Sequence, residues 1–214
     1  IPPALVDALG IRMLIIAKGE GLDRVEDAIV KVATSIATKA EQIASQFAME
    51  QIFNLYMEKR FHNICEVGHG IGTITLMLSM WRCGHTILAV EDESWCCDQA
   101  KRNLGVLAEG IIWYDKVPIY ETFDMVVVDG PQVTAAHWEA CLADRAVVVF
   151  EGNRREQRKI LEVTLRRIGR EFCRVNLKPD DRSKGVWIYH IDPTKHERRF
   201  AMYLQIIELW RDLR

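Results

Sequence analysis

The sequence predicts an α/β fold with a seven-stranded, mostly parallel sheet that ends in an antiparallel hairpin. Short apolar segments alternate with helical ones through the middle of the chain, which is typical of a parallel sheet covered by helices. Three glycines at every second position follow the first of these strands directly. Near the end, two strand-like segments, 171–177 and 184–191, are separated by the turn-forming residues 178–183.

The first 60 residues predict a helical extension ahead of the sheet. From residue 22 to about residue 59, apolar residues recur at helical spacing, with small alanines among them. Residues 193–214 predict an amphipathic helix that carries Trp210. Both helical segments are explained either as a cover for the sheet domain, residues 61–192, or as a homodimer interface, and the N-terminal one also as a substrate-capping element. Periodicity alone does not separate these alternatives. Because the chain begins without an initiator Met, we expect trimming or excision from a longer protein.

The first strand, residues 62–66, leads directly into the glycine turn. Gly68, Gly70 and Gly72 are separated by single residues, and an apolar helix, 74–80, follows at once. Glycine lets the backbone bend sharply and lets a ligand approach main-chain atoms without meeting a Cβ. A helix N-terminus also offers free N–H groups to polar ligand atoms. The spacing differs from the Gly-x-Gly-x-x-Gly fingerprint of dinucleotide-binding folds, so the turn alone is a weak signal.

Acidic residues end all five predicted parallel strands. After the first strand, the others are predicted at 86–90, 111–113, 123–128 and 145–150. The acids are Glu66, Glu91, Asp115, Asp129 and Glu151. One acid where a strand meets water is unremarkable, but the carboxyl ends of parallel strands face the same crevice. Five acids at these ends therefore predict a ligand site, and Glu91, about 20 residues past the glycines, is placed to hold a ribose. A helix at 94–107, with Ser94 as its N-cap, is predicted after the second strand.

From about residue 63 to residue 190 the chain resembles the class I S-adenosylmethionine-dependent methyltransferases. Residues 66–73 (EVGHGIGT) resemble their glycine-rich motif I, residues 88–91 (LAVE) their ribose-binding acid, and residues 123–131 (FDMVVVDGP) their fourth-strand motif. The closing hairpin separates this superfamily from other doubly wound nucleotide folds. The resemblance implies a Rossmann-like methyltransferase fold and S-adenosylmethionine (SAM) as cofactor.

The resemblance also implies roles for individual residues. The cofactor-binding residues would be Glu66, Gly68, Gly70, Gly72, Glu91 and Asp115. Among them, Glu91 would accept hydrogen bonds from the ribose hydroxyls and Asp115 would lie by the adenine. Methyl transfer from a sulfonium is an in-line displacement, so the protein must align the nucleophile and, where needed, remove its proton. Asp129 and His137, the latter on a short helix at the crevice edge, are the catalytic candidates.

The oxygen-bearing side chains at the strand ends suggest a second cofactor, the divalent metal Mg²⁺. Asp129 ends the fourth strand, Glu151 and Asn153 follow the fifth, and Mg²⁺ prefers oxygen ligands. The arrangement resembles metal-dependent O-methyltransferases of the catechol type, in which the metal binds two vicinal hydroxyls and makes the attacked one easier to ionise. In those enzymes an acid after the fourth strand and an Asp-Asn pair after the fifth hold the ion. This chain departs from that pattern because it has Glu151 in place of the Asp, and Gly152 separates Glu151 from Asn153. In the alternative, Asp129 faces the sulfonium, Asn153 caps the following helix and no metal is needed.

The sequence therefore predicts a SAM-dependent methyltransferase that acts on a small-molecule acceptor, with O-methylation as the preferred reaction. One alternative is a non-methylating enzyme on the same fold, such as an aminopropyl transferase or an NAD-dependent oxidoreductase. Another is a catalytically silent assembly module, which the intact glycines and Glu91 disfavour. Base-modifying amino-methyltransferases usually carry Asn/Asp-Pro-Pro-aromatic at the fourth strand, whereas this chain has Asp-Gly-Pro-Gln at 129–132, which argues against nucleobase methylation.

Composition agrees with a cytoplasmic enzyme that has no membrane or nucleic-acid partner. The formal net charge of the 214 residues is −2, so the overall charge of the protein does not favour binding of nucleic acid or another polyanion. The arginines and lysines between residues 154 and 170 are interspersed with glutamates and predict a solvated helix. The six cysteines contain no C-x-x-C pair, which predicts reduced, mostly buried thiols. No apolar run approaches the length of a bilayer, and no signal-peptide pattern is present.

Overall fold

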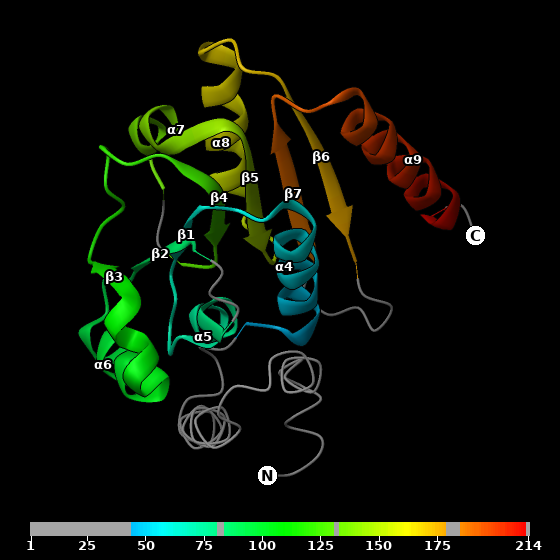
Figure 1. Ribbon diagram of the computed structural model, residues 1–214. Helices are drawn as coiled ribbons and strands as arrows, with labels where there is room; N and C mark the ends of the chain where they lie inside the picture. The colour runs from blue at the N-terminus through cyan, green and yellow to red at the C-terminus, as the bar shows by residue number, and fades with distance from the viewer. Residues whose placement is uncertain (1–43, 81–83, 131–132, 179–184, 213–214) are drawn as a thin grey trace.

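The computed structural model describes residues 44–80, 84–130, 133–178 and 185–212 (Figure 1). The helices are α4 (Gln46–Lys59), α5 (Thr73–Met80), α6 (Ser94–Leu104), the 3₁₀-helix η2 (Gly105–Gly110), α7 (Ala135–Cys141), α8 (Arg155–Arg167) and α9 (Lys195–Asp212). The strands are β1 (Asn63–Val67), β2 (Thr86–Val90), β3 (Ile111–Tyr114), β4 (Phe123–Val128), β5 (Leu142–Glu151), β6 (Phe172–Leu177) and β7 (Val186–Ile191). Most of the predicted N-terminal helical segment, most of the turn at 178–183 and the side chain of Trp210 lie outside the described residues.

The predicted sheet is confirmed. Its seven strands lie in the order β3-β2-β1-β4-β5-β7-β6. The five strands from β3 to β5 in this order pair in parallel, and β7 pairs antiparallel with both β5 and β6. The order reverses next to β1, where the chain crosses from β3 back to β4, and ligands of open α/β sheets bind at such a point.

The register explains why the residues after the strands meet at one level. Val67 of β1 pairs with Val90 of β2 and with Val128 of β4, and Val128 pairs with Phe150 of β5. The next residue of each strand therefore falls at the same edge of the sheet. These four residues are Gly68, Glu91, Asp129 and Glu151.

Side chains alternate between two apolar layers, as expected of strands that are buried on both faces. On one face, Ile64 and Met125 belong to a core that includes residues of α4, α5 and α6. On the other face, Cys65 and Val126 belong to a core that includes residues of α7 and α8 (Figure 1). The described helices therefore bury both faces of the sheet.

Several boundaries differ from those that the sequence predicts. The helix predicted at 94–107 ends at Leu104, because Gly105 takes a positive φ of 56° and the chain continues as η2. Ser94 is the first helical residue, and Glu93 occupies the N-cap position without a side-chain capping bond. The fifth strand starts at Leu142, three residues before the predicted start. No helix lies between β3 and β4, and the buried Val117 fills the core there.

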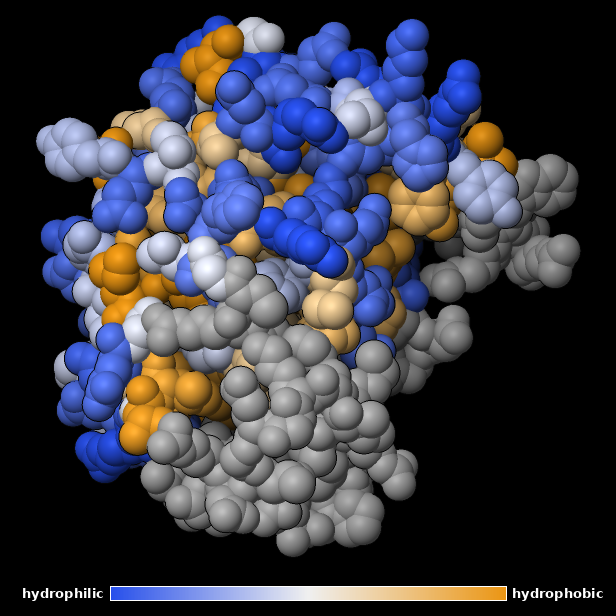
Figure 2. Space-filling view, in the orientation of Figure 1, coloured by the Kyte–Doolittle hydropathy of each residue, from blue (hydrophilic) through white to orange (hydrophobic). Residues whose placement is uncertain are grey.

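Three arginines at the end of α8 and just after it form ion pairs within the protein. Arg166 pairs with Glu162, and Arg167 pairs with Glu139 of α7. Arg170 pairs with Asp192 and donates to the backbone oxygens of residues 142 and 143. Figure 2 shows hydrophilic side chains over the top of the molecule, where α7 and α8 lie. These ion pairs agree with the interpretation of the basic cluster as a solvated, paired helix.

The described cysteines are all free thiols. Cys65, Cys96 and Cys141 are buried, and Cys97 and Cys173 are half-buried. Burial raises the pKa of the thiols at positions 65, 97, 141 and 173, which disfavours the reactive thiolate. Among the helices that the structure describes, none combines the length and the apolar character that a membrane span needs.

Candidate active site at the carboxyl ends of the strands

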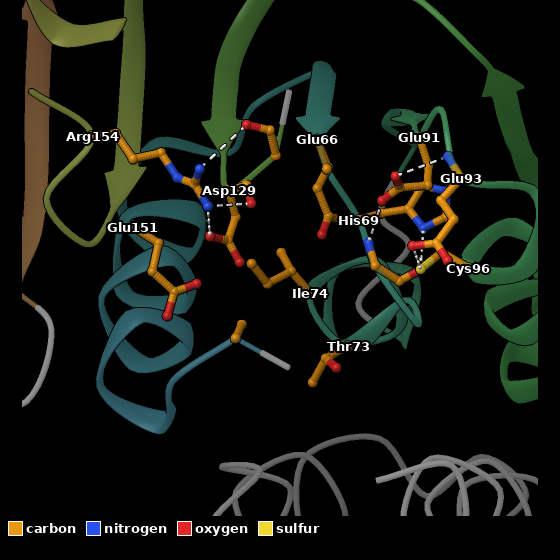
Figure 3. Close-up of a pocket in the computed structure, with 14 residues that line it drawn as sticks. Glu66, His69, Thr73, Ile74, Glu91, Glu93, Cys96, Asp129, Glu151 and Arg154 are labelled. Carbon is orange, nitrogen blue, oxygen red and sulfur yellow. Dashed lines mark hydrogen bonds and ion pairs between the residues drawn. The ribbon is translucent and has the colours of Figure 1, made fainter. Parts of the chain in front are cut away.

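The crevice predicted from the strand ends is a cavity of about 180 Å³ (Figure 3). Four of the five strand-end acids line it, namely Glu66, Glu91, Asp129 and Glu151. The fifth, Asp115, is exposed beyond β3 and does not line the cavity. Edge position explains the difference, because β3 is the outermost strand on this side and the chain turns away after it.

The glycine turn connects β1 to α5, and all three of its glycines have positive φ angles. The N–H of Gly68 donates to the backbone oxygen of Val90 at 2.8 Å. A Cβ on Gly68 would lie 2.0 Å from the Cα of Gly130, so the turns after β1 and β4 pack directly on each other. A Cβ on Gly72 would lie 2.8 Å from the Leu104 side chain. Gly68 and Gly70 line the cavity, whereas Gly72 instead allows α5 to pack against α6.

Glu91 holds the glycine turn in place. Its Oε2 accepts a hydrogen bond from the N–H of Gly70 at 2.9 Å, and its Oε1 accepts from the N–H groups of Asp92 and Glu93 at 3.2 Å each. Burial raises the pKa of this carboxyl above its ordinary value, although the bonds from Gly70 and Glu93 oppose the shift. A carboxylate has about four acceptor positions, so capacity for a ligand hydroxyl remains.

Glu66 is buried at the floor of the cavity and only 1 % of it is exposed. The Thr75 hydroxyl, one turn into α5, donates to its Oε2 at 2.5 Å. Burial raises the pKa of Glu66 to about 8, with smaller contributions from the negative charges of Asp129, Glu91 and Glu151, while the Thr75 bond opposes the shift. The carboxyl is therefore mostly protonated at neutral pH in the absence of a ligand.

His69 is buried between the glycine turn and β3, with 3 % exposed. Its Nδ1 lies 2.8 Å from the backbone oxygen of Gly70, and its ring meets the edge of Trp113 at a centroid distance of 5.1 Å. Its Nε2 lies 3.8 Å from the Sγ of Cys97. Burial lowers the pKa of His69 to about 4, so the ring is neutral and orients the turn without adding charge to the cavity.

Asp129, Glu151 and Arg154 converge at the end of the cavity away from Glu91 (Figure 3). Arg154 donates to Oδ1 of Asp129 at 2.5 Å. Glu151 accepts a hydrogen bond at 2.6 Å from the N–H of Ser45, the N-cap of α4. Burial, followed by the negative charge of Asp129, raises the pKa of Glu151 to about 7. The two acids are thus brought together, but beside a permanent cation.

Two other sequence-predicted site residues face elsewhere. The Nδ1 of His137 accepts a hydrogen bond from the N–H of Thr134 at 3.3 Å and lies 2.8 Å from its hydroxyl, so His137 closes the first turn of α7. Asn153 accepts a hydrogen bond from Arg158 at 3.3 Å, and Arg154 rather than Asn153 is the N-cap residue of α8. Neither His137 nor Asn153 lines the cavity. Among the described residues, no group of three or more His, Cys, Asp or Glu side chains is arranged to hold a metal ion.

The cavity is also lined by Gly130, Thr73 and Arg154, which the sequence motifs do not single out as site residues. Gly130 follows Asp129 in the fourth-strand motif and makes the close approach of two turns possible. Thr73 opens α5, and its Oγ1 is buried with no partner among the described residues. Arg154 belongs to the basic cluster, and only the turn at Gly152, with a φ of 70°, directs it to Asp129. That turn is the signal that could have distinguished Arg154 from its neighbours.

Several solved structures share the fold of this protein. No model of a known protein family matches the sequence, and no curated protein matches it. Among solved structures, an O-methyltransferase from Bacillus cereus in complex with S-adenosylhomocysteine (SAH) is similar at a TM-score of 0.58 and 15 % identity, over 87 % of this chain and 98 % of that one. The O-methyltransferase TomG from Streptomyces achromogenes, involved in tomaymycin synthesis and solved with SAM, is similar at a TM-score of 0.54 and 13 % identity, over 88 % and 96 %. A SAM-dependent O-methyltransferase from Thermotoga maritima is similar at a TM-score of 0.53 and 15 % identity, over 75 % and 70 %.

At these identities the similarity establishes the fold alone. The cavity has an acid at the end of β2 and two glycines of the turn after β1 in its lining, and the buried Oγ1 of Thr73 has no partner among the described residues. The protein thus has the fold of the class I S-adenosylmethionine-dependent methyltransferases.

Proposed function

We propose that the protein is a SAM-dependent O-methyltransferase that acts on a hydroxyl group of a small molecule. The observation that carries this proposal is the convergence of Glu91 and the Gly68–Gly70 turn on one cavity. The O-methyltransferases that share the fold support the reaction class. The acidic lining supports a cationic ligand, because carboxylates in a partly enclosed cleft raise the local concentration of positive charge.

The cavity would hold the cofactor by hydrogen bonds, by close approach to the main chain and by charge attraction. Glu91 would accept hydrogen bonds from the ribose hydroxyls, because three backbone N–H groups already fix its orientation. Gly68 and Gly70 would let the ligand approach the main chain, and Glu66 would face its positive charge. When bound, SAM supplies an electrophilic methyl group on a sulfonium. The protein then has to exclude water and hold the acceptor oxygen in line.

Asp115 has a weaker place in this proposal than the other predicted residues. It is exposed and does not line the cavity, so it would reach an adenine only from the rim. A metal is not part of the proposal, because Asn153 is bonded to Arg158 and Asp129 to Arg154. His137 is not needed as a base either, since it caps α7.

Isothermal titration of SAM and of SAH into the wild type, Glu91→Gln and Asp115→Asn tests the proposal. Loss of hydrogen bonds to a charged acceptor costs about 1.5–3 kcal/mol, so Glu91→Gln should bind roughly ten- to hundredfold more weakly. Asp115→Asn is the matched control and should change affinity by less than about threefold. Binding of NAD in place of SAM would favour an oxidoreductase, and no SAM binding by a folded wild type would overturn the proposal.

We further propose that the chain forms a homodimer through α9, as its amphipathic sequence suggests. Phe200, Met202, Tyr203 and Ile206 leave about half of their side-chain surface exposed on this helix. Exposed apolar side chains gathered on one element are typical of a contact surface. Light scattering of the wild type and of Phe200→Ser/Tyr203→Ser tests this. A dimer that becomes monomeric supports it, and a wild-type monomer at high concentration refutes it.

A further inference from the structure

Arg154 places a fixed positive charge at the end of the cavity opposite Glu91 (Figure 3). Its Nη2 donates both to Oδ1 of Asp129, at 2.5 Å, and to the backbone oxygen of the same residue, and its Nη1 donates to the oxygen of Gly130 at 3.3 Å. These bonds hold the planar guanidinium in one orientation. Its Nε is buried and has no hydrogen-bond partner among the described residues.

The oxygens that the sequence suggests as metal ligands already have other partners. Asn153 accepts from Arg158, and Arg158 is itself held over the ring of Trp187, 3.8 Å from the ring centroid. Asp129 is bonded to Arg154. A divalent ion would have to displace the guanidinium and would gain no ligand from Asn153. The donor set therefore does not fit a metal, and the cation at this place belongs to the chain itself.

Glu151 completes this end of the cavity. Only 4 % of it is exposed, and its Oε2 is buried with no partner among the described residues, whereas its Oε1 is fixed by the N–H of Ser45. Glu151 and Arg154 thus line one cavity, and each has one buried polar atom, an acceptor and a donor, without a partner among the described residues. A hydroxyl group is both a donor and an acceptor, so it can satisfy the two buried groups at once. Left unsatisfied, each would carry a desolvation cost.

We propose that Arg154 takes the place of the divalent metal and holds the acceptor hydroxyl as its anion. This inference rests on the proposed function and names the acceptor class. On binding, the O–H bond breaks, the electron pair stays on the oxygen beside the guanidinium, and the proton passes to the unpaired Oε2 of Glu151, which then donates a hydrogen bond to that oxygen. An arginine remains charged at any working pH and carries only one charge, so it suits an acidic hydroxyl such as a phenol. A single hydroxyl is enough, because no ion has to be chelated by two.

The experiment uses 4-nitrophenol, whose ionised form has its own visible absorption band, with the full chain saturated by SAH and treated with EDTA. In the wild type, the apparent pKa of the bound phenol should fall by about one unit or more, as expected beside a cation. Arg154→Met should abolish the shift while SAH affinity is kept. Arg154→Lys, which keeps the charge, should restore part of it. Arg155→Met, at the exposed neighbouring arginine, is the matched control and should behave as wild type.

The outcomes separate this inference from the proposed function. A folded wild type that does not bind SAH refutes the proposed function. A wild type that binds SAH but leaves the pKa of 4-nitrophenol unchanged, or an Arg154→Met variant that keeps the shift, refutes only the role of Arg154. So does loss of SAH affinity in both Arg154→Met and Arg154→Lys, since the guanidinium would then hold the cofactor. Stoichiometric Mn²⁺ binding by the wild-type SAH complex, with 4-nitrocatechol bound only when Mn²⁺ is present, would also overturn it.

Discussion

Gly68 and Gly130 approach each other so closely that neither has room for a side chain. A Cβ on Gly68 would lie 2.0 Å from the Cα of Gly130, and a Cβ on Gly130 would lie 2.1 Å from the Cα of Gly68. The same contact is supported by the N–H of Asp129, which donates to the backbone oxygen of Val67 at 2.9 Å. The glycine turn after β1 therefore packs directly against the turn after β4. That second turn contains Asp129 and Gly130, both of which accept hydrogen bonds from Arg154.

Gly68→Ala should destabilise the protein strongly. The new methyl group would meet backbone rather than a flexible side chain, and overpacking of this kind costs about 1–3 kcal/mol before the strain of a positive φ is added. Gly169→Ala is the matched control, because Gly169 has a φ of +74° and open space around its Cβ direction. Urea unfolding should give a lower free energy of unfolding for Gly68→Ala than for Gly169→Ala. Equal values would show that backbone strain alone, without the contact, sets the cost.

Between about pH 6.5 and 8 the free energy of unfolding should fall as pH rises. Burial raises the pKa of Glu66 from 4.5 to about 8 and that of Glu151 to about 7. The native state then binds more protons than the unfolded state in this window, so stability is fully present below the unfolded pKa and is lost as pH passes the folded pKa. From about pH 4 to 6.5 the lowered pKa values of His69 and His190, each about 4, make stability rise with pH and so oppose the effect of the buried acids. Glu66→Gln should flatten the curve. A variant that follows the wild-type slope would remove Glu66 as the cause.

SAM binding at pH 7 should release protons from the protein. Glu66 is mostly protonated without ligand, and a positively charged ligand in the same cavity favours its carboxylate. Calorimetry in two buffers with different ionisation enthalpies measures the proton count. Glu66→Gln should release fewer protons than the wild type, and Glu109→Gln, at an exposed acid on η2, should not change the count. Uptake of protons by the wild type would contradict the prediction.

His137→Ala should lower stability by about 1 kcal/mol through loss of the cap on α7. SAM affinity should not change, because His137 does not line the cavity. A double-mutant cycle with Thr134→Ala should give a coupling energy close to the single-variant effect, since both side chains belong to one capping arrangement. Additive effects of the two substitutions would show that His137 acts elsewhere.

The sequence alone determined the α/β class, the parallel strands, the closing hairpin and the crevice lined by strand-end acids. The spacing of apolar residues along the chain indicates whether a segment is a helix or a strand. The same apolar pattern constrains the register of the strands, because a shift by one residue would turn every side chain to the opposite face of the sheet. Four of the acids predicted in this way, Glu66, Glu91, Asp129 and Glu151, line one cavity, whereas Asp115 does not. The end of α6 was placed too late, because a glycine at position 105 is compatible with either a cap or a helical residue.

Only the tertiary structure decided what the loop residues do. The bond between Arg154 and Asp129 joins positions 25 residues apart, and the contact between Gly68 and Gly130 joins two turns from separate parts of the chain. Periodicity carries no information about such pairs, because loop residues have no repeating neighbours and their directions follow from single backbone angles. Asn153 and His137 show the same limit. Asn153 is of a type that suits a metal ligand and His137 of a type that suits a base. In the structure, however, Asn153 is hydrogen-bonded to Arg158 and His137 to Thr134.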